Sequence, residues 1–120
     1  MQFGLTAACA FTHEIAEITA LVQFRLPLPI TLDKAREIFS GTVPKYREIR
    51  GLIRKYYTLS KDGGIADGIY LWESQEDVER LYTDEWKQFI RDTYGTEPSV
   101  VYFDSPLVVD NAAGTIITDA

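Results

Sequence analysis

Lysine and aromatic side chains alternate along two neighbouring segments of this chain, and they are the residues best suited to chemistry. Lys55 and Tyr57 lie two positions apart, as do Tyr70 and Trp72. A lysine removed from water has a lowered pKa and can accept a proton, and in a dry site its ammonium group can stabilise an oxyanion. A tyrosine hydroxyl can donate a hydrogen bond to a substrate oxygen, and an indole can stack on a planar ligand. Lys55, Tyr57 and Tyr70 are therefore candidate catalytic residues, and Trp72 is a candidate substrate-binding residue.

A second group of residues could complete such a site. Phe24, Trp86 and Phe89 could form further walls of a flat pocket, and Arg54 or Arg25 could bind an acidic group of a substrate. Each candidate also has a structural interpretation. Aromatic rings often pack in cores, a lysine stem can pack while its amine reaches solvent, and arginines often form surface ion pairs. The sequence alone leaves both interpretations open.

The composition gives little support to other chemistries and partners. His13 is the only histidine and Cys9 the only cysteine, so neither a serine–histidine triad nor a metal site is expected. The formal net charge of −6 argues against a nucleic acid or an anionic membrane as partner. A single cysteine favours a reducing compartment, and no positively charged segment precedes the first apolar run as in a signal peptide. We expect a cytoplasmic protein, because no apolar run approaches the ~20 residues of a membrane span.

The segment from Gly51 to Glu73 predicts the element that holds the candidate catalytic residues. Two runs of strand character, 52–59 and 65–73, flank the turn Lys61-Asp62-Gly63-Gly64. Asp-Gly followed by glycine is a strong hairpin signal, because glycine reaches positive φ without steric cost. In the first run, strict alternation places Leu52, Arg54 and Tyr56 on one face of the strand. Ile53, Lys55 and Tyr57 then lie on the opposite face.

The rest of the pattern predicts the order β-α-β-β-α-β. A strand is expected over 18–26, and a helix begins after the cap Thr31 and ends near Gly41, followed by a short helical turn around 46–49. The caps Ser74 and Thr83 begin helical segments over 75–82 and 84–94, and a strand follows over 99–103. This order is that of a ferredoxin-like α+β fold, an antiparallel sheet with helices on one face.

Two terminal segments lie outside this order. Residues 1–17 are interpreted as an arm, in which Cys9, Phe11 and Ile15 could form a loose helical stripe, and residues 18–120 as the folded domain. The runs 107–109 and 115–118 could form a small hairpin at the end of the chain.

Both faces of the predicted sheet carry apolar residues. In the strand 18–26, for example, Val22 and Phe24 alternate with Leu21, and in the strand 99–103 Val100 alternates with Val101. Helices can cover only one face, and large apolar patches rarely stay exposed to water. We therefore expect a homodimer in which two sheets pack face to face.

Three segments resemble a known family. The runs GLIRKYY, GIYLWES and YFDSPLVVDN are similar to those of the small YdhR-type monooxygenases, close to the antibiotic-biosynthesis-monooxygenase group, and the resemblance extends from about Ala20 to Asn111. It implies a ferredoxin-like protomer, a dimeric α/β barrel, and a pocket between each sheet and its helices. It also implies oxidation of polycyclic phenols or anthrones to quinones by O2, without metal, haem or flavin. Lys55, Tyr57, Tyr70 and Trp72 occupy matching positions, whereas other members often carry tryptophan at the positions of Arg54 or Tyr57.

The resemblance and the residues together favour one function and leave two others open. The favoured function is a cofactor-independent monooxygenase that acts on a small aromatic or polycyclic compound. An isomerase or dehydratase of the same fold is an alternative, because a fold does not fix a function. A dimeric module that binds an apolar small molecule without changing it is the third.

Overall fold

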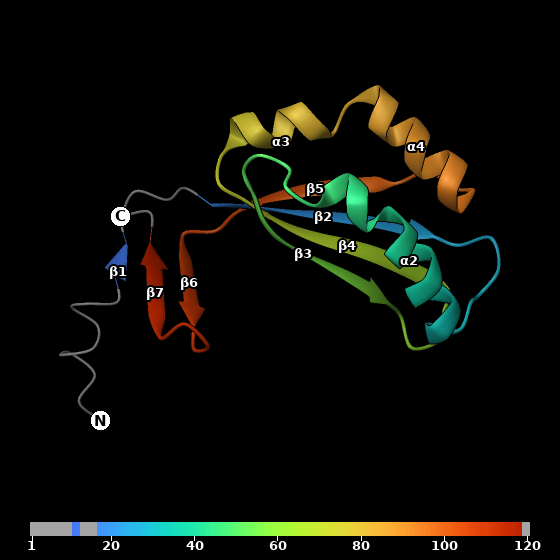
Figure 1. Cartoon of the computed structure of the whole chain (residues 1–120), viewed down its shortest axis with the longest axis horizontal. Coiled ribbons are helices and arrows are strands. Elements are labelled where there is room, and N and C mark those ends of the chain that lie inside the picture. Colours follow the sequence, from blue (N-terminus) through green and yellow to red (C-terminus); the bar gives the residue numbers. More distant parts are fainter. Residues whose placement is uncertain (1–10, 13–16, 119–120) are drawn as a thin grey trace.

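The core of the protein is a four-stranded antiparallel sheet. The computed structural model describes residues 11–12 and 17–118. The strands are β2 (Ile18–Arg25), β3 (Leu52–Leu59), β4 (Ile65–Trp72) and β5 (Ser99–Asp104), in the order β3-β4-β2-β5. All neighbouring pairs run antiparallel, as Figure 1 shows. This is the predicted ferredoxin-like α+β arrangement, so the fold prediction is confirmed.

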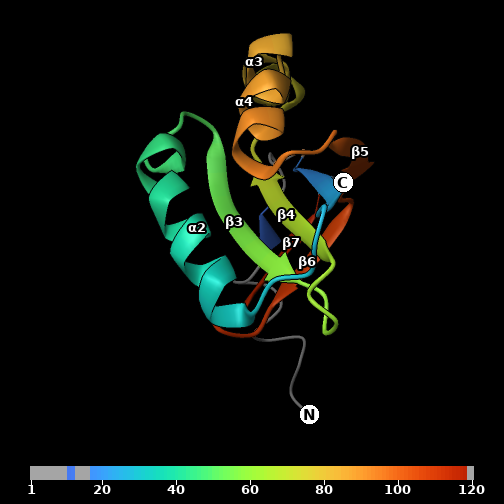
Figure 2. The ribbon, with the colours of Figure 1, turned by 90° about the vertical axis from the view of Figure 1, so that its right-hand side faces the viewer.

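Three helices lie on one face of this sheet (Figures 1 and 2). They are α2 (Leu32–Tyr46), α3 (Gln75–Leu81) and α4 (Asp84–Tyr94). The caps predicted from the sequence are confirmed, because the side chains of Thr31, Ser74 and Thr83 each accept a hydrogen bond from a backbone N–H of the first turn. Gly95 ends α4 in the left-handed conformation, with φ of 75°.

The predicted end of the first helix is wrong. Instead of stopping near Gly41, α2 continues through Pro44 to Tyr46. Thr42 and Tyr46 are buried on the side of α2 that faces the sheet, and the Thr42 hydroxyl donates to the carbonyl of Phe39 at 2.8 Å. Burial of this last turn therefore outweighs the low helix propensity of the glycine and the hydrogen bond that Pro44 cannot donate.

The face under the helices holds the main core. The buried residues of β2 and β4 on this face are Ile18, Ala20, Val22, Phe24, Ala66, Tyr70 and Trp72. Lys55 of β3 pairs with Tyr70 of β4, so Lys55 and Tyr57 also face the helices. The sequence had left open which strand face the helices cover, and the register decides it.

A β-bulge breaks the predicted alternation at the start of β3. Leu52 lies opposite Trp72, whereas Arg54 lies opposite Leu71, so one extra residue is inserted between them. Leu52 therefore packs against the helix-side core, and Arg54 lies on the other face. The predicted grouping of Leu52 with Arg54 is wrong for this reason.

The opposite face of the sheet carries a row of apolar side chains, and none of the described helices lies on it. Tyr56, Ile69, Leu21 and Val101 form a row across all four strands, because each lies opposite the next in register. Tyr56 is 47% exposed, Val101 43%, and the neighbouring Phe103 50%. Residues 108–111, which are most of β6 and the first residue after it, line a cavity together with Tyr56 and Leu71 of this face.

The terminal strands form a separate three-stranded sheet. The strands β1 (Phe11–Thr12), β7 (Thr115–Thr118) and β6 (Leu107–Asp110) lie in the order β1-β7-β6 to one side of the main sheet (Figure 1). The predicted terminal hairpin is thus confirmed as β6 and β7. Phe11 lies in a strand parallel to β7, not in a helix, while Cys9 and Ile15 lie outside the described residues. Within the described part of the chain, no helix is long and apolar enough to cross a membrane.

Candidate functional site

The amine of Lys55 lies among the rings of three tyrosines. Its Nζ is 3.4 Å from the ring centroid of Tyr46, 3.9 Å from that of Tyr57 and 4.6 Å from that of Tyr70. These residues come from α2, β3 and β4, so the cluster forms only when the helix packs on the hairpin. We call Lys55 with Tyr46, Tyr57 and Tyr70 the lysine cluster.

Two opposing effects set the charge of the Lys55 amine. Burial lowers the pKa of Lys55 from its usual 10.5 to about 7, because the ammonium form loses water. The ring faces attract a cation and so favour the ammonium form. None of the ion pairs within residues 17–118 includes Lys55, so no carboxylate holds its charge. The result is an amine that can exist in either protonation state near neutral pH.

Trp86 of α4 holds the Tyr46 ring in place. Its indole Nε1 donates a buried hydrogen bond of 3.0 Å to the Tyr46 hydroxyl. Burial raises the pKa of Tyr46, and burial together with the neighbouring Tyr46 raises the pKa of Tyr70 well above its usual value. Both hydroxyls are therefore neutral at physiological pH and remain potential hydrogen-bond donors.

The Tyr57 hydroxyl has a defined donor direction. It lies 3.0 Å from the Thr42 hydroxyl, which in turn donates its only proton to the Phe39 carbonyl. Tyr57 must therefore donate to Thr42. The ring of Tyr57 also packs against Phe39, with centroids 5.1 Å apart. These contacts fix the ring between α2 and β3.

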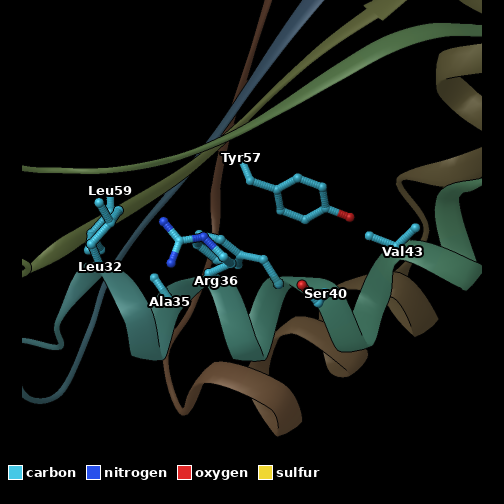
Figure 3. Close-up of a pocket in the computed structure, with 8 residues that line it drawn as sticks. Leu32, Ala35, Arg36, Ser40, Val43, Tyr57 and Leu59 are labelled. Carbon is cyan, nitrogen blue, oxygen red and sulfur yellow. The ribbon is translucent and has the colours of Figure 1, made fainter.

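A cavity of about 350 Å³ lies between α2 and β3, beside the lysine cluster (Figure 3). Its walls are mostly apolar, and the residues that line it are Leu32, Ala35, Arg36, Phe39, Ser40, Val43, Tyr57 and Leu59. A second cavity of about 270 Å³ opens at the edge of β3 and is lined in part by Tyr46, Lys55 and Tyr57. A void of about 10 Å³ adjoins Lys55, Phe24 and Tyr94. Tyr57 lines all three spaces, and its ring lies between the cavity of about 350 Å³ and the lysine amine.

The structure brings some of the candidates from the sequence to this cluster. Lys55, Tyr57 and Tyr70 meet in it, and Phe24 lines the adjoining void, where its ring centroid lies 4.3 Å from that of Tyr94. Trp86 contacts the cluster through its hydrogen bond to Tyr46.

The remaining candidates lie elsewhere. Trp72 is fully buried behind Tyr70, with ring centroids 6.1 Å apart, and none of the described cavities contacts it. Phe89 packs under the Lys45 amine, 4.5 Å from its ring centroid. Arg54 lies on the face away from the helices, where it donates to the Tyr56 hydroxyl at 3.2 Å. It lines the second cavity and also the cavity beside Tyr56 and Leu71.

Sequence reasoning did not include two residues that complete the cluster. Tyr46 follows Ala35, Phe39 and Thr42 at helical spacing, and this stripe becomes visible only if the helix is extended past Gly41. Gly68 is the other, because a Cβ there would lie 2.8 Å from Cε1 of Tyr70 and 3.4 Å from Cε of Lys55. No pattern in the sequence distinguishes Gly68 from other strand glycines.

The described residues offer no evident metal site. No group of three or more histidine, cysteine, aspartate or glutamate side chains gathers there in a way that could hold an ion. The side chains of the lysine cluster can themselves transfer a proton at Lys55 and donate hydrogen bonds from tyrosine hydroxyls.

Comparison with solved structures places the chain in a known fold. No protein-family model matches the chain, and none of the curated proteins matches its sequence. The monooxygenase from the gene ActVA-Orf6 of Streptomyces coelicolor, in complex with nanaomycin D, is similar at 23% identity, with a TM-score of 0.59 over 75% of this chain and 88% of that chain. SnoaB, a cofactor-independent oxygenase from Streptomyces nogalater, is similar at 14% identity, with a TM-score of 0.58 over 75% of this chain and 93% of that one. An antibiotic biosynthesis monooxygenase is similar at 15% identity, with a TM-score of 0.56 over 73% and 97%.

At these identities the similarity establishes the fold and leaves the activity open. The chain shares the ferredoxin-like protomer of antibiotic biosynthesis monooxygenases.

Proposed function

We propose that this protein is a cofactor-independent monooxygenase that oxidises a small aromatic or polycyclic phenol or anthrone with O2. The observation that carries the proposal is the Lys55 amine, whose pKa burial lowers to about 7 and which forms no ion pair with a carboxylate among the described residues. Lys55 lines the cavity of about 270 Å³ at the edge of β3, and only the Tyr57 ring lies between it and the mostly apolar cavity under α2. Two proteins of the same fold are a monooxygenase and a cofactor-independent oxygenase, and one of them binds nanaomycin D. Their chemistry is the reason to prefer oxygenation over other proton-transfer reactions.

The cluster supplies what such a reaction requires of a protein. The neutral Lys55 amine accepts the proton of an anthrone methylene or a phenol, which leaves a resonance-stabilised anion. A neighbouring tyrosine hydroxyl hydrogen-bonds the anionic oxygen. The anion passes one electron to O2, and the resulting radical and superoxide combine into a peroxide anion, which takes the proton from the Lys55 ammonium to become a hydroperoxide. Loss of water from the hydroperoxide then gives the quinone carbonyl, so one oxygen atom enters the product and the other leaves as water.

Oxygen consumption by the purified protein tests this proposal. Anthrone and 1-naphthol are offered to chelator-treated protein, and oxygen uptake and quinone formation are followed together. We expect substrate-dependent uptake that Lys55→Met abolishes and the control Lys34→Met preserves, because Lys34 is exposed and pairs with Glu37 on the outside of α2. Uptake that persists in Lys55→Met would exclude Lys55 as the base.

The same assay distinguishes the two alternatives. A product that forms equally under nitrogen would indicate an isomerase or dehydratase. A bound but chemically unchanged ligand would indicate a binding module. Either result would overturn the oxygenase proposal.

We further propose that two copies pair through the exposed face of the main sheet. The support is the row of apolar side chains on that face, with Tyr56, Val101 and Phe103 each more than 40% exposed. Burial of such a row against a second copy removes apolar surface from water. A cytoplasmic location remains a prediction that rests on Cys9 having no second cysteine with which to form an intramolecular disulfide.

A further inference from the structure

A single charged residue, Arg36, lines the cavity of about 350 Å³ between α2 and β3. Of the residues that line the space between α2 and β3, only Arg36 is charged, and the others are apolar except for the Ser40 and Tyr57 hydroxyls. In a chain with a formal net charge of −6, this cavity is thus lined by a cation and by no anion. An apolar space with one guanidinium at its edge suits a ligand that is mostly hydrocarbon and carries one negative charge.

The guanidinium of Arg36 has free donors for such a ligand. Its Nη1 donates to Asp33 Oδ1 at 2.8 Å, in a pair whose side chains are 64% and 94% exposed. An exposed pair of this kind contributes only about 0.5 kcal/mol and uses one of the five N–H donors of the arginine. Figure 3 shows the guanidinium directed along the cavity toward Leu32 and Leu59. The remaining donors can bind a carboxylate in the bidentate geometry that arginine favours.

The position of Arg36 in the cavity also predicts how a bound ligand would be oriented. Leu32 and Leu59 mark the end of the cavity near the N-terminus of α2, where the helix dipole favours negative charge. Tyr57 bounds the cavity toward Lys55, and Leu59 lies four residues along β3 from Lys55, or roughly 13 Å at ~3.3 Å per residue. A fused-ring ligand with its acid group at Arg36 would lie against Phe39 and Tyr57, with its opposite edge toward the lysine cluster.

We propose that the cavity selects aromatic substrates that bear a carboxylate, and that Arg36 is the residue that binds this carboxylate. The reaction that follows rests on the proposed oxygenase function, whereas the binding selectivity does not. Arg36 therefore acts as a specificity-determining residue at the opposite end of the cavity from the Lys55 amine.

Calorimetric titration with two matched ligands tests this selectivity. The probes are 6-hydroxy-2-naphthoate and 2-naphthol, which share the ring system and differ in the carboxylate. The variants are Arg36→Gln and the control Lys34→Gln, because Lys34 lies on the same helix in an equivalent exposed pair with Glu37 and does not line the cavity. Both variants remove one positive charge, so a general electrostatic effect would be equal in the two.

We expect the wild-type protein to bind the naphthoate more tightly than the naphthol. Arg36→Gln should weaken naphthoate binding about 10-fold, as expected for the loss of a charge-assisted hydrogen bond of about 1.5 kcal/mol, and leave naphthol binding unchanged. Lys34→Gln should change neither. Equal loss for both ligands, equal loss in both variants, or no naphthoate binding by the wild-type protein would each overturn the proposal.

The outcome also separates this inference from the proposed function. Selective loss in Arg36→Gln without oxygen uptake for either ligand would support the ligand class and reject the oxygenase. Oxygen uptake that is equal for both ligands and unaffected by Arg36→Gln would support the oxygenase and reject the role of Arg36.

Discussion

Replacement of Lys55 by methionine should make the protein more stable at neutral pH. The native state buries the Lys55 amine, and that burial lowers the pKa of Lys55 from 10.5 to about 7. A change of this size corresponds to roughly 5 kcal/mol at about 1.4 kcal/mol per pH unit. Methionine has a similar length and no charge, so Lys55→Met should remove most of this cost and gain up to about 5 kcal/mol.

The lowered pKa of Lys55 predicts how the free energy of unfolding changes with pH. The pKa of Lys55 is lower in the folded state than in the unfolded state, so between about pH 7 and 10.5 the unfolded chain binds the extra proton. Wild-type stability should therefore rise with pH in this window, and the full cost should apply below about pH 7. The advantage of Lys55→Met should be largest at pH 6 to 7 and should shrink by up to about 1.4 kcal/mol for each pH unit above it.

Urea unfolding followed by tryptophan fluorescence measures this difference. Curves for the wild-type protein, Lys55→Met and the control Lys34→Met are recorded at intervals between pH 6 and 9. The control loses an exposed lysine that pairs with Glu37, so its difference from the wild type should be small and nearly constant with pH. A destabilised Lys55→Met variant with the pH profile of the wild type would show that the amine is neither desolvated nor perturbed, and would refute the reasoning.

Two further predictions concern Gly68, which packs against Tyr70 and Lys55, and the exposed face of the main sheet. Gly68→Ala should destabilise the protein by about 1–3 kcal/mol in urea unfolding, because its Cβ would lie 2.8 Å from Cε1 of Tyr70. The control Gly41→Ala lies in a helix, where its Cβ would meet nothing within 4 Å, so it should stabilise the protein by about 0.5–1 kcal/mol. Equal effects of the two substitutions would contradict the geometry around Gly68. Phe103→Asp should convert a dimer into a monomer in sedimentation velocity, since Phe103 is 50% exposed on the apolar face, whereas Leu28→Asp, in the loop before α2, should leave the dimer intact. A monomeric wild-type protein would contradict the second prediction.

Local signals in the sequence were enough to predict the strands of the main sheet, the helix caps and the hairpin, but not β1, whose Phe11 had been assigned to a helical stripe. The Asp62-Gly63-Gly64 turn and the capping side chains act over a few residues, so a single segment contains the information. Ser60, Asp62 and Gly63 form the hydrogen bonds that close the turn, and Ser74 accepts from the backbone N–H of Asp77 as a capping box requires. The order of the strands within the sheet follows only when these elements are combined with the known arrangement of a β-α-β-β-α-β chain in one sheet.

The face assignment could not be predicted, because both faces of the strands are apolar. Leu21 and Val22 point to opposite faces of their strand, so an apolar side chain would face the helices whichever side the helices cover. The bulge before Arg54 adds a second difficulty, since it moves Leu52 to the helix side and no glycine marks its position. Arg54 was placed among the candidates because strict alternation in β3 does not reveal which of its faces lies beneath the helices.

The largest error in the prediction of the helix concerns the residue that closes the lysine cluster. A stop at Gly41 follows from propensity, because glycine costs about 1 kcal/mol in a helix and Pro44 removes a hydrogen bond. Tyr46 is only 6% exposed in the structure, and burial of an aromatic side chain contributes roughly 1.5–3 kcal/mol, to which its hydrogen bond with Trp86 adds about 1 kcal/mol. This tertiary gain offsets much of the local cost, and it depends on Trp86, which lies forty residues further along the chain. The nearest ring around the Lys55 amine thus exists because a distant helix stabilises one further turn of α2, and a sequence pattern with a range of a few residues does not contain that contact.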